Sequence, residues 1–451
     1  MHRADESSAA PGPFRAAGEA KLASRRGFLG AAAAALSLAV TGCAPPSPRQ
    51  PRRMRLTLRR PSGPYRVGTV SLHLVDHSRR DPWLAGNRRR ELMVSIWYPA
   101  QDDNRYPRAP WMPAKAGALF LTQLIPSPLT GPSAAPPAPR IALDGVQLPV
   151  TRARLGTPAD LSGKRYPIVL YSPGYQDDRA LGTGLVSDLA SRGYVVVTTD
   201  YTYEAAEVQF PGGRVEVARQ TNIPGAVKVR IADTRFVLDQ LAVLNSGISP
   251  DAGHRPLPVG LAGALDLART GMFGHSLGGA TAAEAMAADR KILAGIDLDG
   301  TIIVSGLPTP GDQASFTLVK HLAGAVARRI GDRPFMIMTH AGHGPRDDVT
   351  LEALWANLTG WRRLLTLANS GHYSYTDDEE FLTQLVRAGI VPSSRASQVI
   401  TPVIGTIDPD RAVAAERAYV GAFFDVHLRH RASNLLDRPS LQYPDIQFIA
   451  T

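Results

Sequence analysis

A serine stands between closely spaced glycines in Gly274-His275-Ser276-Leu277-Gly278, which matches the G-x-S-x-G nucleophile elbow. In such an elbow the serine occupies the tip of a sharp strand-to-helix turn, where the two backbones nearly touch. Gly274 and Gly278 supply the small residues that this approach requires, and Gly279 keeps the first helical turn slim. The pattern predicts that Ser276 is a nucleophile rather than an idle serine in a glycine-rich turn. The helix N-terminus beside it can stabilise a developing negative charge.

The hydroxyl of Ser276 needs an imidazole to accept its proton and a carboxylate to orient that imidazole. In elbow enzymes these partners follow the serine in the order acid, then histidine. A predicted strand runs into Asp297-Leu298-Asp299-Gly300. We choose Asp299 as the acid, because it lies at the strand tip before a glycine and can turn toward the centre. Asp297 is the alternative, and it could instead accept a hydrogen bond from backbone near the strand end.

The chain has 11 histidines, and the base must follow the acid. His372 comes directly after the predicted last strand and is our choice for the base. His343 follows an earlier strand and is the alternative. His275 is the neighbour of Ser276 in the elbow, but we expect its side chain to point away into the scaffold.

Two backbone amides are expected to form an oxyanion hole. One belongs to Leu277, directly after the nucleophile, and the other to Tyr175, in the turn after an earlier strand. The sequence contains no His-x-x-Glu-His pattern and no cysteine cluster, so we expect neither a metal nor a cofactor. This set of residues predicts acyl transfer through a covalent acyl-enzyme.

The elements needed to position these residues alternate between strand and helix. Apolar runs predict strands over 65–74, 91–99, 166–171, 194–199, 269–273, 291–297, 334–339 and 364–368, and helices over 181–192, 227–244, 280–288, 351–358 and 411–428. This order predicts an α/β-hydrolase fold, with a mostly parallel sheet flanked by helices on both faces and the site above the strand ends. A hairpin over 208–217, with a Gly-Gly turn, is expected to form a rim of the site.

The N-terminus carries targeting signals. Ser24-Arg25-Arg26-Gly27-Phe28-Leu29 resembles a twin-arginine export signal, and the apolar run over 28–40 is too short to span a bilayer. The following Val40-Thr41-Gly42-Cys43 resembles a lipobox. We therefore predict export by the twin-arginine route, lipidation of Cys43 and anchoring at the outer face of the bacterial cell membrane, or secretion. The alternative is a signal peptide with a chance cysteine at its end. Cys43 is the only cysteine, which excludes an intramolecular disulfide.

Composition indicates a soluble globular protein, with 44% hydrophobic and 20% charged residues. We divide it into a signal peptide over 1–42, a flexible tether rich in Pro and Arg over 43–62, and a catalytic domain over 63–451. An irregular, proline-rich insertion with a short helix is expected at about 100–164. The net charge of +10 is interpreted as a solvated basic surface, and no motif accompanies it that would indicate nucleic-acid binding. The sequence specifies no oligomeric state.

Several stretches together resemble the plasma-type (isoform II) platelet-activating factor acetylhydrolases, a family of the α/β-hydrolase superfamily, and their bacterial relatives. They are Val94-Ser95-Ile96-Trp97-Tyr98-Pro99, Ile168-Val169-Leu170-Tyr171-Ser172-Pro173-Gly174, the elbow, Asp297-Leu298-Asp299-Gly300 and Gly371-His372. The resemblance implies a calcium-independent serine esterase that removes short or oxidised acyl chains from phospholipids. It also implies the triad Ser276, Asp299 and His372, with Leu277 and Tyr175 as oxyanion donors.

One departure from that family bears on the substrate. Vertebrate members carry a His-Gly pair where this chain has Pro173-Gly174. The same strand-end pattern also resembles lipases and cutinase-like polyester hydrolases, which are the alternative function. A third hypothesis is a non-catalytic surface lipoprotein that keeps the fold as a binding module.

Overall fold

The computed structural model describes residues 53–124, 143–162, 165–302 and 313–449. The predicted export signal, the apolar run and Cys43 lie outside these residues, as does the first part of the predicted tether. Within the described ranges no helix is both long and apolar enough to cross a bilayer.

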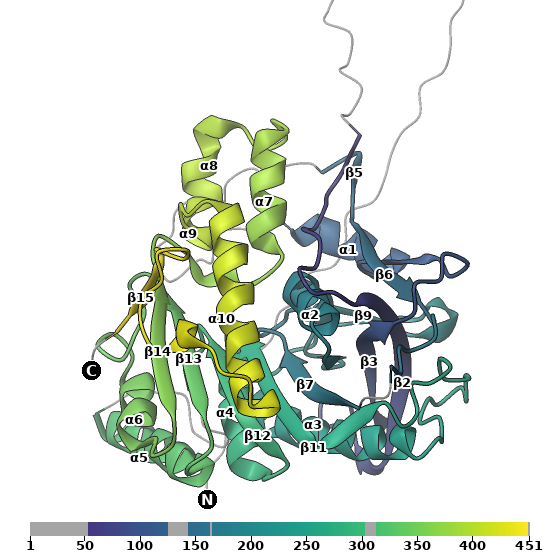
Figure 1. Cartoon of the computed structure of the whole chain (residues 1–451), viewed down its shortest axis with the longest axis horizontal. Coiled ribbons are helices and arrows are strands. Elements are labelled where there is room, and N and C mark those ends of the chain that lie inside the picture. The colour runs from purple at the N-terminus through teal and green to yellow at the C-terminus, as the bar shows by residue number, and fades with distance from the viewer. Residues whose placement is uncertain (1–52, 125–142, 163–164, 303–312, 450–451) are drawn as a thin grey trace, which may run out of the picture. The chain divides into compact units, whose positions relative to one another are not determined.

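A large twisted sheet forms the centre of the described domain (Figure 1). Its eleven strands in this part of the chain lie in the order β15 (Ile446–Phe448), β14 (Arg362–Leu367), β13 (Phe335–His340), β12 (Ile292–Leu298), β11 (Leu265–His275), β7 (Tyr166–Ser172), β8 (Val195–Asp200), β3 (Arg89–Ala100), β2 (Arg66–Arg80), β6 (Val150–Leu155) and β4 (Arg108–Pro110). From β14 through β8 all neighbours pair in parallel, whereas β3, β2 and β15 join antiparallel. Parallel strands bring their carboxyl ends to one edge of the sheet, where the site is expected.

Helices cover both faces of this sheet (Figure 1). One apolar core joins the sheet to α3 (Ile223–Asn245), α4 (Leu277–Ala288), α5 (Gln313–Ile330) and α6 (Val349–Asn357). A second core, on the other face, joins it to α2 (Thr183–Ser191) and α10 (Pro409–Arg429). The central strands are buried on both faces, which explains their continuous apolar sequences. The predicted α/β-hydrolase fold is confirmed.

The predicted strands and helices all form, although their ends differ by several residues. The strand predicted over 65–74 continues to Arg80. The predicted hairpin is present as β9 (Glu207–Gln209) and β10 (Val215–Val217), paired antiparallel. The strand predicted to be the last is followed by β15, which adds three residues to the sheet edge. So short a strand has no hydrophobic period by which a sequence could reveal it.

The predicted insertion at about 100–164 is more regular than expected. It contains the short helix α1 (Ala114–Gln123), but it also supplies β4 and β6 to the sheet edge. An apolar cluster joins α1 to three helices from the C-terminal third of the chain, α7 (Asp378–Arg387), α8 (Ser393–Val399) and α9 (Thr401–Ile404), and these elements lie together beyond one end of the sheet (Figure 1).

The tether predicted over 43–62 is wrong for its last part. The strand β1 (Met54–Arg55) pairs with β5 (Val146–Gln147), and Leu56 is fully buried in the cluster of α1 and α7. Both the backbone N–H and the hydroxyl of Thr57 donate to Gln384 Oε1. The alternating Met54, Leu56 and Leu58 give this segment an apolar side, which packs on the domain instead of remaining solvated.

Candidate active site

The strand β11 ends at His275 and α4 begins at Leu277, so Ser276 occupies the turn between them. Its backbone has φ 55° and ψ −122°, a strained conformation for a residue with a side chain. A Cβ on Gly278 would lie 1.9 Å from the carbonyl oxygen of Ser172, and one on Gly274 would lie 2.3 Å from the backbone of Gly278. The glycines therefore allow the close backbone contact that the sequence pattern predicts.

Ser276, His372 and Asp299 come together above the carboxyl ends of the parallel strands. His372 Nε2 lies 3.0 Å from Ser276 Oγ, and His372 Nδ1 donates a hydrogen bond to Asp299 Oδ2. His372 follows β14 in a short 3-10 helix (His372–Tyr375), and Asp299 follows β12 with φ 60°. Three residues that are far apart in the sequence thus form one chain of hydrogen bonds, as a Ser-His-Asp arrangement requires.

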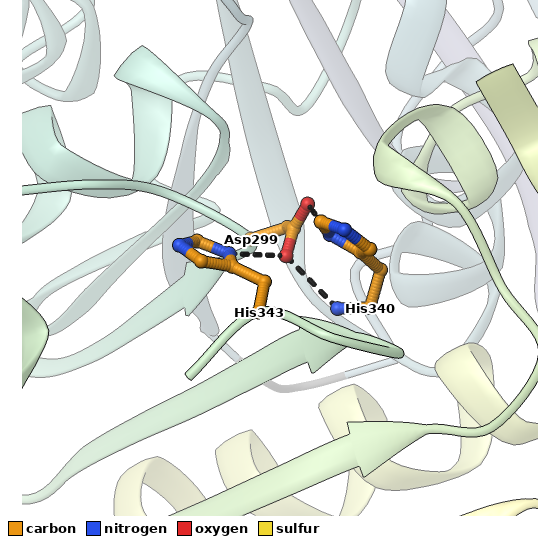
Figure 2. Close-up of side chains that lie close together, drawn as sticks. All are labelled: Asp299, His340 and His343. Carbon is orange, nitrogen blue, oxygen red and sulfur yellow. Dashed lines mark hydrogen bonds and ion pairs between the residues drawn. The ribbon is translucent and has the colours of Figure 1, made fainter. Parts of the chain in front are cut away.

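Asp299 receives four hydrogen bonds. Besides the one from His372, its Oδ2 accepts from His340 Nδ1 at 2.7 Å, and its Oδ1 accepts from His343 Nδ1 at 2.8 Å and from the backbone N–H of His340 at 2.9 Å. Figure 2 shows His340 and His343 on either side of the carboxylate. Both come from the end of β13 and the loop after it. The carboxylate, which follows β12, is therefore fixed in position by residues from the ends of the next two strands, β13 and β14.

These contacts determine the charges at the site. Burial raises the pKa of Asp299, whereas the hydrogen bonds from His340, His343 and His372 lower it. The hydrogen bonds together have the larger effect, so the pKa of Asp299 lies well below its ordinary value. Burial lowers the pKa of His343, yet its bonds to Asp299 and Asp348 raise it to about 10. Burial is also the largest influence on His372 and brings its pKa below 6.5, despite the bond to Asp299. At neutral pH the site thus contains an ionised acid and a neutral base.

Asp297, the alternative acid, lies on β12 two residues before Asp299, but outside this chain of hydrogen bonds. Its Oδ1 accepts from the backbone N–H of Gly300 at 2.8 Å, which is the kind of role that the sequence suggested for it. Burial raises its pKa well above the ordinary value. Its carboxyl group packs against Gly279, where a Cβ would lie 1.8 Å from Asp297 Oδ1. Asp297 therefore supports the helix start of the elbow.

His275 lies below the serine, pointing into the scaffold as the sequence analysis expects. Its side chain is fully buried, and its Nε2 donates to the backbone carbonyl of His372 at 2.8 Å. The centroids of the His275 and His372 rings are 4.7 Å apart. Sequence analysis did not foresee that His275 would support the loop that carries His372.

The two amides predicted to bind an oxyanion belong to the elbow and to the turn after β7. Leu277 is the first residue of α4, so its N–H has no partner within the helix. Tyr175 lies in a turn that is closed by a bond from Asp177 N–H to the Gly174 carbonyl. Among the described hydrogen bonds neither amide has an acceptor. The side chain of Leu277 belongs to an apolar cluster, and Tyr175 packs against the same cluster.

Asp299, His340 and His343 also form the one group in the described ranges with metal-ligand chemistry, with one ligand atom from each within 4.8 Å of the others. In this group both imidazole Nδ1 atoms donate hydrogen bonds to the carboxylate, and His343 Nε2 faces Asp348 Oδ2 at 3.4 Å. A metal ion would have to displace these protons and the bond to His372. We therefore interpret the group as a hydrogen-bonded support of Asp299.

Three supporting residues were absent from the sequence analysis or had another role there. His343 was the alternative base, but it is a second donor to Asp299. His340 lies three residues before it, at the end of β13, and could have been recognised from that spacing. Arg230, on α3, contacts the turn that carries Tyr175, and no local pattern indicates this.

A family model described as platelet-activating factor acetylhydrolase, isoform II, matches residues 52–220. A probable 1-alkyl-2-acetylglycerophosphocholine esterase from Arthroderma benhamiae is 26% identical over 410 residues, which cover 86% of this chain and 92% of that protein. The chain belongs to the platelet-activating factor acetylhydrolase family. As a member of this family it is a carboxylic ester hydrolase.

Two further proteins are similar to this chain, over different shares of its length. A platelet-activating factor acetylhydrolase from Cavia porcellus is 25% identical over 277 residues, which span 56% of this chain and 59% of that protein. A solved structure of a ferulic acid esterase from Streptomyces cinnamoneus is 33% identical, with a TM-score of 0.64, and the match covers 88% of this chain and 99% of that one.

Proposed function

We propose that the protein is a serine esterase in which Ser276 is the nucleophile, His372 the general base and Asp299 the acid that orients His372. The observation that carries this proposal is the hydrogen-bonded chain from Ser276 Oγ through His372 to Asp299. Its substrates are short or oxidised acyl esters, including those of phospholipids, in keeping with the phospholipid esterases among its relatives.

The reaction has two stages. Ser276 Oγ attacks the ester carbonyl carbon while its proton passes to His372 Nε2, and the carbonyl oxygen becomes an oxyanion that accepts from the Leu277 and Tyr175 amides. When the tetrahedral intermediate collapses, the ester bond breaks and the departing alcohol takes the proton from His372. Water then attacks the acyl carbonyl carbon and gives a proton to His372. When this second intermediate collapses, the bond to Ser276 Oγ breaks, Ser276 Oγ takes the proton from His372, and the acid is released. Asp299 stabilises the imidazolium in both stages.

Substitution of Ser276 with alanine tests this proposal. We expect kcat for p-nitrophenyl acetate to fall by roughly 10⁴-fold or more, and labelling by a fluorophosphonate probe to disappear. Ser246→Ala, at an exposed helix end, is the matched control and should keep full activity. Unchanged turnover in Ser276→Ala would exclude the mechanism. Failure of the probe to label the unaltered protein would favour a binding module without catalysis.

A second candidate substrate class is the aromatic ester of a hydroxycinnamic acid. It is favoured by the ferulic acid esterase, whose similarity covers almost its entire chain. Methyl ferulate, 1-alkyl-2-acetylglycerophosphocholine and a series of p-nitrophenyl esters from acetate to palmitate would distinguish the classes by kcat/KM. Preference for the long acyl chains would favour the lipase or polyester hydrolase instead.

We further propose that the enzyme is exported by the twin-arginine route and anchored through lipidated Cys43 at the outer face of the cell membrane. The order of an Arg25-Arg26 pair, an apolar run and Val40-Thr41-Gly42-Cys43 supports this. Cys43→Ser should abolish labelling by radioactive palmitate and release the protein from the membrane fraction. Palmitate labelling that persists in Cys43→Ser would contradict the anchor.

A further inference from the structure

Arg230 projects from α3 into the interior beneath the turn that follows β7. Its side chain is only 1% exposed, and burying a guanidinium in this way requires that its donors be satisfied. Its Nε donates to Glu204 Oε2 at 2.7 Å, and its Nη2 donates to the other carboxylate oxygen of Glu204. The guanidinium also lies over the ring of Tyr201, 4.3 Å from its centroid. The ion pair with Glu204 compensates the charge but leaves further donors of Arg230 available.

The remaining donors of Arg230 bond to consecutive residues of the turn. Nη1 donates to the Pro173 carbonyl at 2.6 Å and to Ser172 Oγ at 3.2 Å, and Nη2 donates to the Gly174 carbonyl at 2.8 Å. The Gly174 carbonyl also accepts from Asp177 N–H at 3.2 Å. One buried side chain thus binds two successive carbonyl groups at the point where the chain leaves the sheet.

The Gly174 carbonyl belongs to the same peptide unit as the N–H of Tyr175. A trans peptide is planar, and its C=O and N–H point to opposite sides. When Arg230 and Asp177 hold the carbonyl on one side, the Tyr175 N–H must therefore point to the other. No described hydrogen bond takes up that N–H or the N–H of Leu277, and Tyr175 packs against the apolar cluster that contains Leu277.

The turn is also pressed against the elbow. A Cβ on Gly278 would meet the carbonyl oxygens of both Ser172 and Pro173, at 1.9 and 2.7 Å. A rotation of the Pro173–Tyr175 backbone would therefore change the distance between the Tyr175 amide and Ser276. The bonds of Arg230 oppose such a rotation.

We propose that Arg230 is a positioning residue for the oxyanion hole, which aims the Tyr175 amide at the tetrahedral intermediate by binding the carbonyl of the same peptide unit. This inference rests on the proposed function, in which the Tyr175 amide stabilises the oxyanion. Arg230 itself does not touch the substrate.

An arginine is needed here for its geometry as well as its charge. The guanidinium has five N–H donors in a rigid plane, and Arg230 uses them to connect Glu204 with Pro173 and Gly174. A lysine has three donors on one atom and cannot reach both the carboxylate and the two carbonyl groups. Arg230→Lys would keep the positive charge beside Glu204 and release the turn.

The test compares Arg230→Lys with Arg90→Lys. Arg90, on β3, is the matched control. It is fully buried and paired with Asp81 and with Asp233, which lies on α3 like Arg230, but none of its described bonds reaches the turn. For Arg230→Lys we expect kcat on p-nitrophenyl acetate to fall roughly 10- to 100-fold, with KM changed less than about threefold. Phenylboronic acid forms a serine adduct that mimics the tetrahedral intermediate, and its inhibition constant should rise by a similar factor.

Arg90→Lys should lower the melting temperature without changing kcat or boronate binding. The proposal would be overturned by an Arg230→Lys protein that melts earlier but keeps kcat and boronate affinity, or by an equal loss of kcat in Arg90→Lys. If Arg230→Lys does not fold, Glu204→Gln replaces it, since it retains Arg230 but weakens the support of its guanidinium. It should lower kcat by a smaller factor, and an unchanged kcat would overturn the proposal.

The failure of this inference differs from the failure of the proposed function. If the unaltered enzyme is active and Ser276→Ala is inactive, the esterase mechanism stands. An unchanged kcat in Arg230→Lys would then refute only the positioning role of Arg230. If Ser276→Ala remains active, the mechanism itself is wrong.

Discussion

On the acid side of Ser276, a carboxylate receives hydrogen bonds from side chains that follow neighbouring strands. Asp299 is held by His340, His343 and His372, and the pKa values of His343 and His372 are shifted by their contacts at this site. On the oxyanion side, the candidate donors are backbone amides of Leu277 and Tyr175. The turn of Tyr175 is held through its carbonyl groups by Arg230, whose charge is permanent.

This difference separates two kinds of control over one reaction. The acid side sets the protonation of His372 and should respond to pH and to the charge of its neighbours. The oxyanion side sets the direction of an amide and should respond to geometry alone. Substitutions on the acid side are therefore expected to change the pH profile, whereas Arg230→Lys should reduce kcat without moving the profile.

The largest effect is expected when the acid side loses its carboxylate. Asp299→Asn should lower kcat by about 10⁴-fold, because an amide cannot stabilise the imidazolium and favours the wrong tautomer of His372. Steady-state kinetics with p-nitrophenyl acetate would measure this loss. Asp297→Asn changes the alternative acid on β12, and it should lower kcat far less, because Asp297 supports the elbow but does not bond to His372. An equal loss in both variants would indicate that the acid has been misassigned.

A smaller effect is expected when one support of Asp299 is removed. His343→Gln should lower kcat roughly tenfold, since one hydrogen bond to a charged group contributes about 1.5 kcal/mol. It also removes a positive charge, so His372 should be protonated more easily and the acid limb of the pH profile should move to higher pH. His427→Gln is the control, because His427 is a half-buried histidine that packs on Trp361 and has no described bond to Asp299. A profile that stays in place would mean that His343 has no electrostatic role.

The pH profile of the unaltered enzyme gives a third comparison. Activity requires neutral His372, and its pKa lies below 6.5 because burial disfavours the charged form. Since the neutral fraction falls only as pH drops through this lowered pKa, the midpoint of the acid limb of kcat/KM should lie below pH 6.5. A midpoint above 6.5 would show that Asp299 outweighs burial at this histidine. Arg230→Lys should leave the midpoint in place.

The smallest effect is expected from removal of metal ions. If Asp299, His340 and His343 form a hydrogen-bonded group, dialysis against EDTA should leave kcat and KM unchanged. Metal analysis of the purified protein before and after dialysis provides the control. A loss of activity that is restored by a divalent transition metal would show instead that these residues bind an ion.

The local parts of the site were predictable from sequence because their geometry depends on neighbouring residues. The glycines around Ser276 show where backbones touch, and the ends of apolar runs show where parallel strands stop. Because those strands end at one edge, Asp299 and His372 could be selected as residues near Ser276. The structure brings the three together, and their catalytic roles remain the proposal that Ser276→Ala and Asp299→Asn test.

Other parts could not be predicted, since they depend on side chains that approach one another only after folding. His343 looked like a second candidate base, and only its position beside Asp299 makes it a hydrogen-bond donor to the acid. The segment after Met54 looked like a tether, and only the cluster around Leu56 shows that it packs on the domain.

The sequence by itself determined the fold class, the elbow and the order of the candidate catalytic residues, because each follows from short patterns and from strand ends that share one edge. Only the tertiary structure decided how Asp299 is supported and how the turn of Tyr175 is held. Arg230 and Gly174 are distant in the chain, and nothing local to either residue reports their contact. Where the guanidinium of Arg230 points depends on how α3 packs against the sheet.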